Sequence, residues 1–380
     1  MNEIKKKVAL MTIYQVPNYG SVLQTYATVK ILESLGYSCD VINYKYPNEW
    51  HYRHGAKKYK KAWWQPFYVW VSQNFGLKKK HVFWRNLEYF KKKYLTQTVQ
   101  MNSLEELSCH DWVQYTTVIA GSDQIWNPKY LHGDSAFMLS FVPDDVRKIS
   151  FSSSFAVASI PVILQKKYRK NLNRFSYITV REENGKKIVD EELKLNVPST
   201  IIPDPTLLIS ATQWSSLLKL KVNTQTKPYI LLYILDYAFN PIPYIFDIVK
   251  YFQDKYQYDV KVVCENEWLF SKYLTNYHFC GDASPKNFLE LISGAALIVT
   301  SSFHGTAFSV NFGRPLIAVI PEGGDDRQNT LLCSLHLENS ALQVGSNFKY
   351  PIKHYSTSSA QQNLTRIRIH ALNRIASIIN

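Results

Sequence analysis

Five polar clusters in this sequence each follow a short apolar run, and they hold the residues best suited to chemistry. They are Asn18-Tyr19-Gly20, Gly121-Ser122-Asp123-Gln124, Arg181-Glu182, Asp204 and Ser301-Ser302-Phe303-His304-Gly305. Histidine and aspartate transfer protons, and arginine binds phosphate or carboxylate through paired hydrogen bonds. A polar loop before a helix also presents backbone N–H groups to an anion. The clusters therefore suit proton transfer on an anionic substrate.

Within these clusters, His304 is the first candidate for a general acid or base, because it is expected to begin a helix between Ser302 and Gly305. Asp123 is the second candidate. Each cluster also has a structural interpretation. Asp123 would then bond neighbouring backbone amides, and Arg181 would pair with Glu182, Glu183 or a helix C-terminus. His304 would be a helix-start residue, Asn18-Tyr19-Gly20 a plain turn, and Asp204, between two prolines, structural.

The elements that must position these residues alternate between strand and helix, which predicts a parallel α/β architecture. Strands are expected at 8–13, 39–44, 117–120, 148–153, 176–180, 200–202, 229–234, 259–264, 296–300 and 315–320. Helices are expected at 21–35, 241–252, 284–294, 304–312 and 359–379. All five clusters follow strands, and ligands bind outside the carboxyl ends of strands in open α/β sheets. We therefore expect the clusters to converge on one site.

Two successive α/β series predict two domains, at 1–208 and 209–380, and a length of 380 residues suits that number. A basic, aromatic helical insert is expected near 46–110, in the first domain. The C-terminal helix is a candidate to pack back on the N-terminal domain.

The formal net charge is +14, and much of it is local. Residues 51–93 contain twelve Lys or Arg and one acidic residue, Glu88, with aromatic residues between them. This stretch is open to two interpretations: a solvated helical face, or a surface for anionic lipid headgroups. Nucleic acid is not expected as a partner, because no known binding motif is present.

Several function classes are disfavoured by missing patterns. The sequence has no GxGxxG, no GxxxxGK[ST] and no HExxH, so no cofactor or metal is expected. Asp325-Asp326 is interpreted as a turn pair. The first residues are interpreted as a strand instead of a signal peptide. Five cysteines without a CxxC pair suggest reduced thiols and a cytoplasmic location.

Taken together, the motifs resemble the polysaccharide pyruvyltransferase family. The matching stretches are TIYQVPNYGSVLQTYA, LGYSCDVINY, GSDQIWNP, ISFSSSFA, ITVREENG, PDPTLL, TSSFHGTAFSVNFGRPLIAV and DDRQNTLL. They come in the family's order and extend over about residues 8 to 335, while 46–110 and the C-terminal tail contribute nothing. The combination is specific, although no single stretch would be.

The resemblance implies a GT-B-like fold, with two Rossmann-like domains facing each other across a cleft. It also implies transfer of a pyruvyl group from phosphoenolpyruvate to a pair of sugar hydroxyls. The implied site residues are His304 and Asp123 for catalysis; Arg181, Ser302, Phe303 and Arg327 for the donor; and Asn18, Tyr19, Gly20, Ser122, Gln124, Trp126 and Asp204 for the acceptor or the cleft lining.

One position departs from the family pattern. Ser302-Phe303-His304 stands where characterised relatives have Arg-Leu-His, so the histidine is kept and the arginine is not. Either Arg327 or Arg314 then supplies the positive charge that the replaced arginine would bring to the donor, or the chain belongs to a branch of the family that uses another donor.

The implied setting is capsular or exopolysaccharide biosynthesis, with a lipid-linked oligosaccharide acceptor and a peripheral contact with the inner membrane. Two other functions stay open at this point. One is a GT-B-type glycosyltransferase that uses a nucleotide-sugar donor. The other is a non-catalytic protein that binds anionic polysaccharide or lipid.

Overall fold

A computed structural model describes residues 6–46, 78–221, 227–235, 238–264, 272–348 and 357–380. The chain divides into two compact units. Unit 1 comprises the described parts of Met1–Ser72, Phe90–Leu208 and Ile369–Asn380, and unit 2 those of Gln73–Tyr89 and Ile209–Arg368. Compared with the expected domains, residues 78–89 therefore group with the second half of the chain and residues 369–380 with the first.

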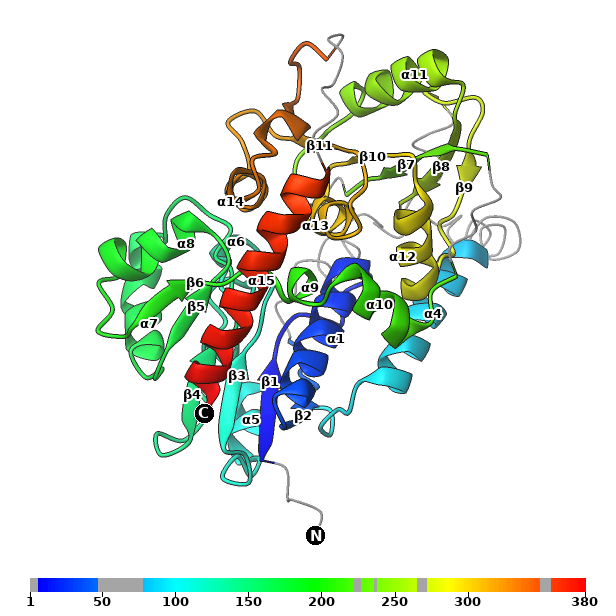
Figure 1. The fold of residues 1–380 in the computed structure, drawn as a ribbon. Coiled ribbons are helices and arrows are strands. Elements are labelled where there is room, and N and C mark those ends of the chain that lie inside the picture. The colour runs from blue at the N-terminus through cyan, green and yellow to red at the C-terminus, as the bar shows by residue number, and fades with distance from the viewer. Residues whose placement is uncertain (1–5, 47–77, 222–226, 236–237, 265–271, 349–356) are drawn as a thin grey trace, which may run out of the picture. The chain divides into compact units, whose positions relative to one another are not determined.

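Unit 1 is built on parallel strands (Figure 1). A four-stranded sheet has the order β2-β1-β3-β4, from Ser38–Val41, Lys7–Met11, Thr117–Ala120 and Arg147–Ser150. A parallel pair, β5 (Ile178–Val180) and β6 (Ser199–Ile201), continues from β4 through isolated bridges. The strand order reverses between β1 and β3, so this is the topological switch point where such sheets bind ligands.

The helices of unit 1 are mostly short. They are α1 (Tyr19–Ser34), α5 (Leu104–Cys109), α6 (Pro128–Leu131), α7 (Val162–Leu172), α8 (Glu183–Lys187) and α9 (Pro205–Leu208), with the end of α4 (Lys78–Tyr94). The helix expected at 21–35 is present as α1, which is buried almost all round. Its buried Thr25 and Thr28 hydroxyls donate to the carbonyls of Ser21 and Gln24, which satisfies them inside the core.

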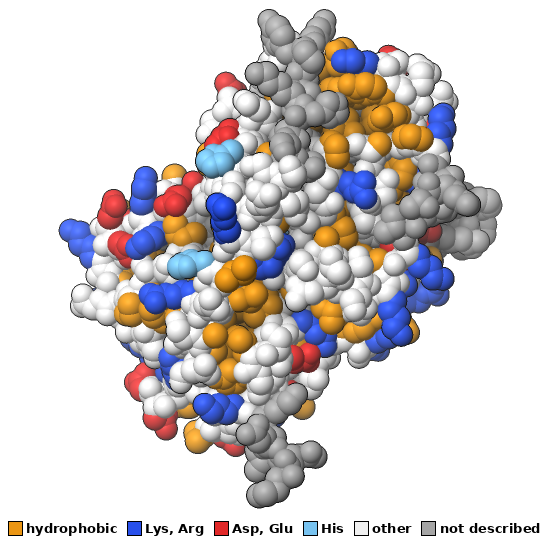
Figure 2. Space-filling view, viewed as in Figure 1, with side chains coloured by type: hydrophobic (Ala, Val, Ile, Leu, Met, Phe, Trp, Pro, Cys, Tyr) orange, Lys and Arg blue, Asp and Glu red, His pale blue; other side chains and the backbone are white. Residues whose placement is uncertain are grey.

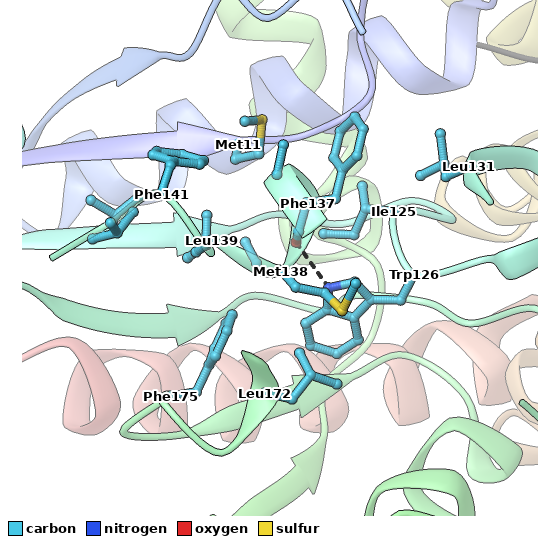
Figure 3. Close-up of a cluster of buried hydrophobic side chains, with 14 of the residues drawn as sticks. Met11, Ile125, Trp126, Leu131, Phe137, Met138, Leu139, Phe141, Leu172 and Phe175 are labelled. Carbon is cyan, nitrogen blue, oxygen red and sulfur yellow. Dashed lines mark hydrogen bonds between the residues drawn. The ribbon is translucent and has the colours of Figure 1, made fainter. Parts of the chain in front are cut away.

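The core of unit 1 packs large aromatic side chains beneath the sheet (Figure 3). The Trp126 indole N–H donates to the carbonyl oxygen of Phe137 at 3.0 Å. The Trp126 ring also contacts Phe155 and Phe175, at ring-centroid distances of 5.1 and 5.9 Å. Trp126 was expected to line the cleft and is 1% exposed. The structure therefore corrects that expectation, since a large apolar ring with its one polar atom satisfied is most stable in the core.

Unit 2 has a six-stranded, all-parallel sheet of order β12-β11-β10-β7-β8-β9. Its strands in chain order are Tyr229–Tyr233, Asp259–Val263, His278–Phe279, Leu297–Thr300, Leu316–Ile320 and Ala341–Gln343. Numbered within the unit, this is the 3-2-1-4-5-6 order of a Rossmann fold, whose switch point lies between its first and fourth strands, here β7 and β10.

Besides residues 78–89 of α4 and the short 3₁₀ helix Glu338–Ser340, the described residues of unit 2 form six helices. They are α10 (Ala211–Leu218), α11 (Tyr244–Tyr256), α12 (Pro285–Gly294), α13 (Phe303–Asn311), α14 (Asp326–Ser334) and the first part of α15 (Thr357–Ile379). The predicted Ser284-Pro285 helix start is present, and the Ser284 hydroxyl accepts from the backbone N–H of Asn287 at 3.1 Å. The last residues of α15 belong to unit 1, where Arg147 donates to the carbonyl of Ile379.

The basic insert expected near 46–110 lies partly outside the described residues. The description resumes at residue 78, where α4 begins. Between α4 and α5 the chain is extended instead of helical. It runs beside β2, with the Val41 N–H donating to the carbonyl of Thr96 at 2.8 Å and the Thr98 N–H to the carbonyl of Val41 at 3.0 Å. Lys and Arg side chains are spread over the face shown in Figure 2 and do not merge into one basic field there.

Candidate functional site

Two loops meet at the switch point of unit 1. Asn18 precedes α1 and caps it, because its side-chain oxygen accepts from the backbone N–H of Gly20 at 2.7 Å. The Ser21 hydroxyl, one turn into α1, donates to Asp123 Oδ2 at 2.7 Å. The Thr12 hydroxyl donates to the carbonyl oxygen of Ser122 at 2.7 Å. The loops after β1 and β3 are therefore tied together at the carboxyl edge, as the sequence predicts.

Asp123 has an unusual backbone at this switch point. Its φ of +76° lies in the left-handed region, which a non-glycine residue adopts at a cost of about 1 kcal/mol or more. Its Oδ1 accepts from the backbone N–H of Gln124 at 2.9 Å, and its Oδ2 accepts from Ser21. This strained position therefore lies at the switch point, and a catalytic role for Asp123 stays a prediction.

Arg181 lies in a buried network of carboxylates. Its side chain is 0% exposed, and its Nη1 donates to Asp204 Oδ2 at 2.7 Å. Its Nη2 lies 3.5 Å from Asp123 Oδ1, and its Nε lies 3.8 Å from Glu182 Oε2. One guanidinium thus faces three carboxylates, which fixes the end of β5 against the loops after β3 and β6.

The carboxylates of this network have further partners. Asp204 accepts from the Ser122 hydroxyl at 2.9 Å and from the Thr206 N–H and hydroxyl. Glu182 accepts from the Ser154 hydroxyl at 2.9 Å and from the Phe155 N–H at 3.0 Å. Donor binding by Arg181 stays a prediction, and it would require the guanidinium to exchange Asp204 for the donor.

In unit 2, hydrogen bonds hold the start of α13 at the switch point. The Ser301 hydroxyl donates to the carbonyl of Leu235 at 2.9 Å, and the Leu235 N–H donates back at 3.0 Å. The Thr300 hydroxyl donates to the carbonyl of Tyr233 at 2.7 Å. The ends of β7 and β10 are thus joined directly below the first turn of α13. This first turn is where the positive end of a helix dipole favours an anion.

Ser302, Phe303 and His304 form this first turn. The Ser302 hydroxyl caps α13 by accepting from the Gly305 N–H at 3.3 Å. His304 is 5% exposed, and its ring contacts the Phe303 ring edge-on at a centroid distance of 5.3 Å. Ser302, in place of the family's arginine, is therefore a helix cap and brings no charge.

A cation lies beside the same ring. The Arg327 guanidinium carbon is 5.9 Å from the Phe303 ring centroid. Arg327 binds Asp325 through Nη2 at 2.6 Å and Nε at 3.2 Å. Burial raises the pKa of Asp325, but the Arg327 charge, its hydrogen bonds and two backbone N–H groups outweigh burial, so the pKa is lowered. Phe303 thus contacts both His304 and Arg327.

Two expectations about unit 2 need correction. Asp325 is no turn residue, because its side chain caps α14 by accepting from the N–H groups of Arg327 and Gln328. Arg314 stands just before β11, at the amino edge of the sheet, opposite to the edge that holds His304. Of the two arginines considered as replacements for the family's arginine, Arg327 is therefore the one near His304.

Gly305 allows α13 to pass close to the sheet, and this gives a prediction. A Cβ at this position would lie 2.3 Å from Thr300 Oγ1 and 2.9 Å from Tyr233 Cδ1. Because both neighbours are packed at the switch point, Gly305→Ala should destabilise unit 2 by about 1–3 kcal/mol. Thermal or denaturant unfolding measures this. An unchanged midpoint would mean that α13 is free to move away from β10.

Other predicted site residues of unit 1 lie near the same edge. Tyr19 and Gly20 begin α1 and are buried. The Gln124 side-chain oxygen accepts from the Asn127 amide at 2.8 Å. Ser21, Gln328 and Thr306 also lie at these edges and were not predicted; Gln328 joins α14 to α13 by donating to the Thr306 hydroxyl at 2.9 Å. For Ser21 and Thr306, a polar residue next to apolar ones in a predicted helix was the signal available.

Within the described part of the chain, no three His, Cys, Asp or Glu residues are arranged to hold a metal ion. Across the same residues, no helix is both long and apolar enough to cross a bilayer.

Comparison with solved structures defines the fold class. An S. aureus MnaA–UDP structure has a TM-score of 0.53 at 10% identity, covering 97% of this chain and 90% of that one. UDP-GlcNAc 2-epimerase from Methanocaldococcus jannaschii has a TM-score of 0.51 at 12% identity, with 95% and 92% covered. Phytolacca americana UGT2, complexed with UDP-2fluoro-glucose and pterostilbene, has a TM-score of 0.50 at 10% identity, with 99% and 100% covered. At these identities the likeness shows the fold alone: α/β, with two Rossmann-like domains of the GT-B type.

The family follows from the sequence itself. The profile of the polysaccharide pyruvyl transferase family matches residues 18–322, so the chain belongs to that family. No curated relative matches the chain. The matched range contains Asn18, Asp123, Arg181, Asp204 and His304, while Arg327 lies just beyond its end.

Proposed function

We propose that this chain transfers a pyruvyl group from phosphoenolpyruvate to two hydroxyls of one sugar, forming a ketal during capsular or exopolysaccharide biosynthesis. The family match supports the reaction class. The observation that carries the proposal is the place of His304, in the first turn of α13 at the switch point of a Rossmann-ordered sheet. A proton-transferring side chain there stands where such sheets bind anionic ligands.

The chemistry requires one proton to be delivered and two to be removed. Protonation of the methylene carbon of phosphoenolpyruvate turns it into a methyl group and makes C2 electrophilic. A sugar hydroxyl then attacks C2 and loses its proton, and the bond between C2 and the phosphate oxygen breaks. A second hydroxyl of the same sugar closes the ketal ring and loses its proton. Of the two protons removed, one replaces the proton delivered to the methylene carbon and the other goes to the leaving phosphate, so the products are the ketal and inorganic phosphate.

In unit 2, His304 is proposed to deliver the proton to the methylene carbon. The first turn of α13 would stabilise the donor's negative charge through its N–H groups and dipole. Arg327 would add a cation near the Phe303 ring. Because Arg327 already binds Asp325 through two nitrogens, it would share its guanidinium between this carboxylate and the donor.

In unit 1, Asp123 is proposed to accept a proton from an attacking hydroxyl. Ser21 and the Gln124 N–H already hold its carboxylate in place, which fits a positioned base. Asn18, Tyr19, Gly20, Ser122, Gln124 and Asp204 are proposed to contact or frame the acceptor. That both units act on one donor and acceptor pair, across a shared cleft, stays a prediction.

The acceptor is proposed to be a lipid-linked oligosaccharide, and the enzyme to work in the cytoplasm at the inner membrane. The basic stretch that ends in α4 is one source of membrane attraction. In α4, Lys92 and Lys93 are exposed. Lys91 is buried, with its ammonium 3.4 Å from Gln15 Oε1 and 5.7 Å from the Tyr14 ring centroid. The part of the stretch at residues 51–77 lies outside the described residues.

This proposal gives a prediction for α4. Lys92→Glu with Lys93→Glu should weaken sedimentation with anionic vesicles by about tenfold or more, because each lysine near such a surface contributes about 1 kcal/mol. Lys91 should be left unchanged, since replacing a buried side chain would also disturb the core. Vesicle binding equal to that of the wild type would favour a solvated face instead.

A donor screen by phosphorus NMR tests the proposed function, using isolated lipid-linked oligosaccharides as acceptors. We expect inorganic phosphate to appear from phosphoenolpyruvate only when an acceptor is present. Release of a nucleoside diphosphate from a nucleotide-sugar would instead make the chain a glycosyltransferase. Salt-sensitive binding of polysaccharide or lipid without turnover of any donor would make it a non-catalytic binding protein.

A further inference from the structure

The start of α7 exposes two large aliphatic side chains next to each other. Val162 and Ile163 are 83% and 88% exposed, the highest values among the large hydrophobic side chains that the structure describes. Pro161 before them is exposed as well. Two adjacent β-branched side chains are seldom this exposed to water. We therefore expect the apolar tip formed by Pro161, Val162 and Ile163 to bind a partner.

Buried residues next to the tip, and on the opposite side of α7, anchor it to unit 1. Ile160 is buried, and its N–H donates to Glu192 Oε1 at 2.8 Å. On the opposite side of α7, Tyr168 and Leu172 are buried in the core. The Tyr168 hydroxyl donates to the carbonyl of Trp126 at 2.9 Å. The exposed tip is therefore a fixed part of the unit 1 surface.

Three exposed lysines share the face of α7 that carries the tip. Lys166, Lys167 and Lys170 are all exposed, and the helix contains no acidic residue. At 100° per residue, Val162, Ile163 and the three lysines fall within an arc of about 140°. Helical side chains lean toward the N-terminus, so the lysine chains extend toward the apolar tip.

We propose that this α7 tip, formed by Pro161, Val162, Ile163, Lys166, Lys167 and Lys170, docks on a bilayer rich in anionic phospholipid. The aliphatic side chains would enter the acyl boundary, and the ammonium groups would bind headgroup phosphates. A protein partner fits less well, because specific interfaces need about 800 Å² on each side and are depleted in lysine. Nucleic acid offers nothing that would bury Val162 and Ile163.

The tip lies at the same end of unit 1 as its candidate site residues. α7 follows β4, so the N-terminus of α7 stands at the carboxyl edge of the sheet, where Asp123 lies. Ser154, which donates to Glu182 in the buried network, precedes Val162 by eight residues, a span of at most about 28 Å. If the proposed function holds, docking would bring Asp123 close to a sugar carried on a membrane lipid.

Co-sedimentation of the full chain with phosphatidylcholine vesicles, with and without phosphatidylglycerol, tests this proposal. The wild type should bind the anionic vesicles and lose binding as salt rises. V162S/I163S should lower the partition coefficient by about tenfold. K166Q/K167Q/K170Q should lower it by on the order of 100-fold on anionic vesicles only.

Matched controls should bind as the wild type does. They are V99S/V113S, which alters two other exposed valines, and K6Q/K45Q/K250Q, which alters three other exposed lysines. Absence of vesicle binding by the wild type, or unchanged binding of either α7 variant, would overturn the proposal. Turnover with a water-soluble acceptor should be the same in the α7 variants, so failure to dock is distinguishable from failure of the proposed chemistry.

Discussion

His304→Ala is expected to lower turnover with phosphoenolpyruvate by a factor on the order of 100 or more, the usual contribution of a general acid or base. The affinity for the donor should change less, because the helix N-terminus and Arg327 remain. The reason is the place of His304 in the first turn of α13, beside the Phe303 ring, where we propose that it transfers the proton. Initial rates at saturating acceptor, with donor concentration varied, separate the two effects.

His278→Ala is the matched control, because His278 is an exposed histidine at the far edge of the same sheet. It should behave as the wild type does. Added imidazole should restore part of the turnover of His304→Ala if the ring transfers a proton. If His304→Ala turned over near the wild-type rate, His304 would be a structural residue, and Asp123 would become the leading candidate.

Arg181→Met is expected to destabilise the protein by about 3–5 kcal/mol, because it leaves buried carboxylates without their cation. Asp204 is 0% exposed and bonds Arg181 at 2.7 Å, and Asp123 and Glu182 face the same guanidinium. This loss is a large part of the 5–15 kcal/mol that stabilises a typical protein. Denaturant unfolding measures it.

A second variant shows how much of the destabilisation by Arg181→Met comes from the unbalanced buried carboxylates and how much from lost packing. Arg181→Met combined with Asp204→Asn should recover part of the loss, because one buried charge is removed along with the cation. Arg181→Lys should stay folded, since it keeps the charge, and it should weaken donor binding if Arg181 does contact the donor. A wild-type midpoint for Arg181→Met would show that the carboxylates do not depend on Arg181.

Much of the architecture was predictable because buried parallel strands are short apolar runs. Thr117–Ala120 was predicted to the residue, and Tyr229–Tyr233 and Leu316–Ile320 to within one residue at each end. β9 and β12 were missed because their sequences, His-Phe and Ala-Leu-Gln, stand among polar residues and form no apolar run. Local sequence also could not reveal that residues 95–101 pair with β2, since that pairing is tertiary.

The places of the candidate residues on their sheets were predictable, and their contacts were less so. Polar residues after strands mark the carboxyl edge, and the loops holding Asn18, Asp123 and His304 are at the switch points of their sheets. The partner of Arg181 was not predictable, because Asp204 stands 23 residues away and meets it only through the pairing of β5 with β6. Trp126 stands in the same motif as Asp123, yet its ring points into the core.

The most direct test of the account follows the carbon skeleton of the donor. Phosphoenolpyruvate labelled with carbon-13 at C2 is incubated with the protein and isolated lipid-linked oligosaccharides, and the acceptor is then examined by carbon NMR. The account predicts a labelled ketal carbon in the acceptor, with one phosphate released per label transferred, and neither product with His304→Ala. Phosphate release without label in the acceptor, or transfer of a sugar from a nucleotide-sugar in its place, would contradict it.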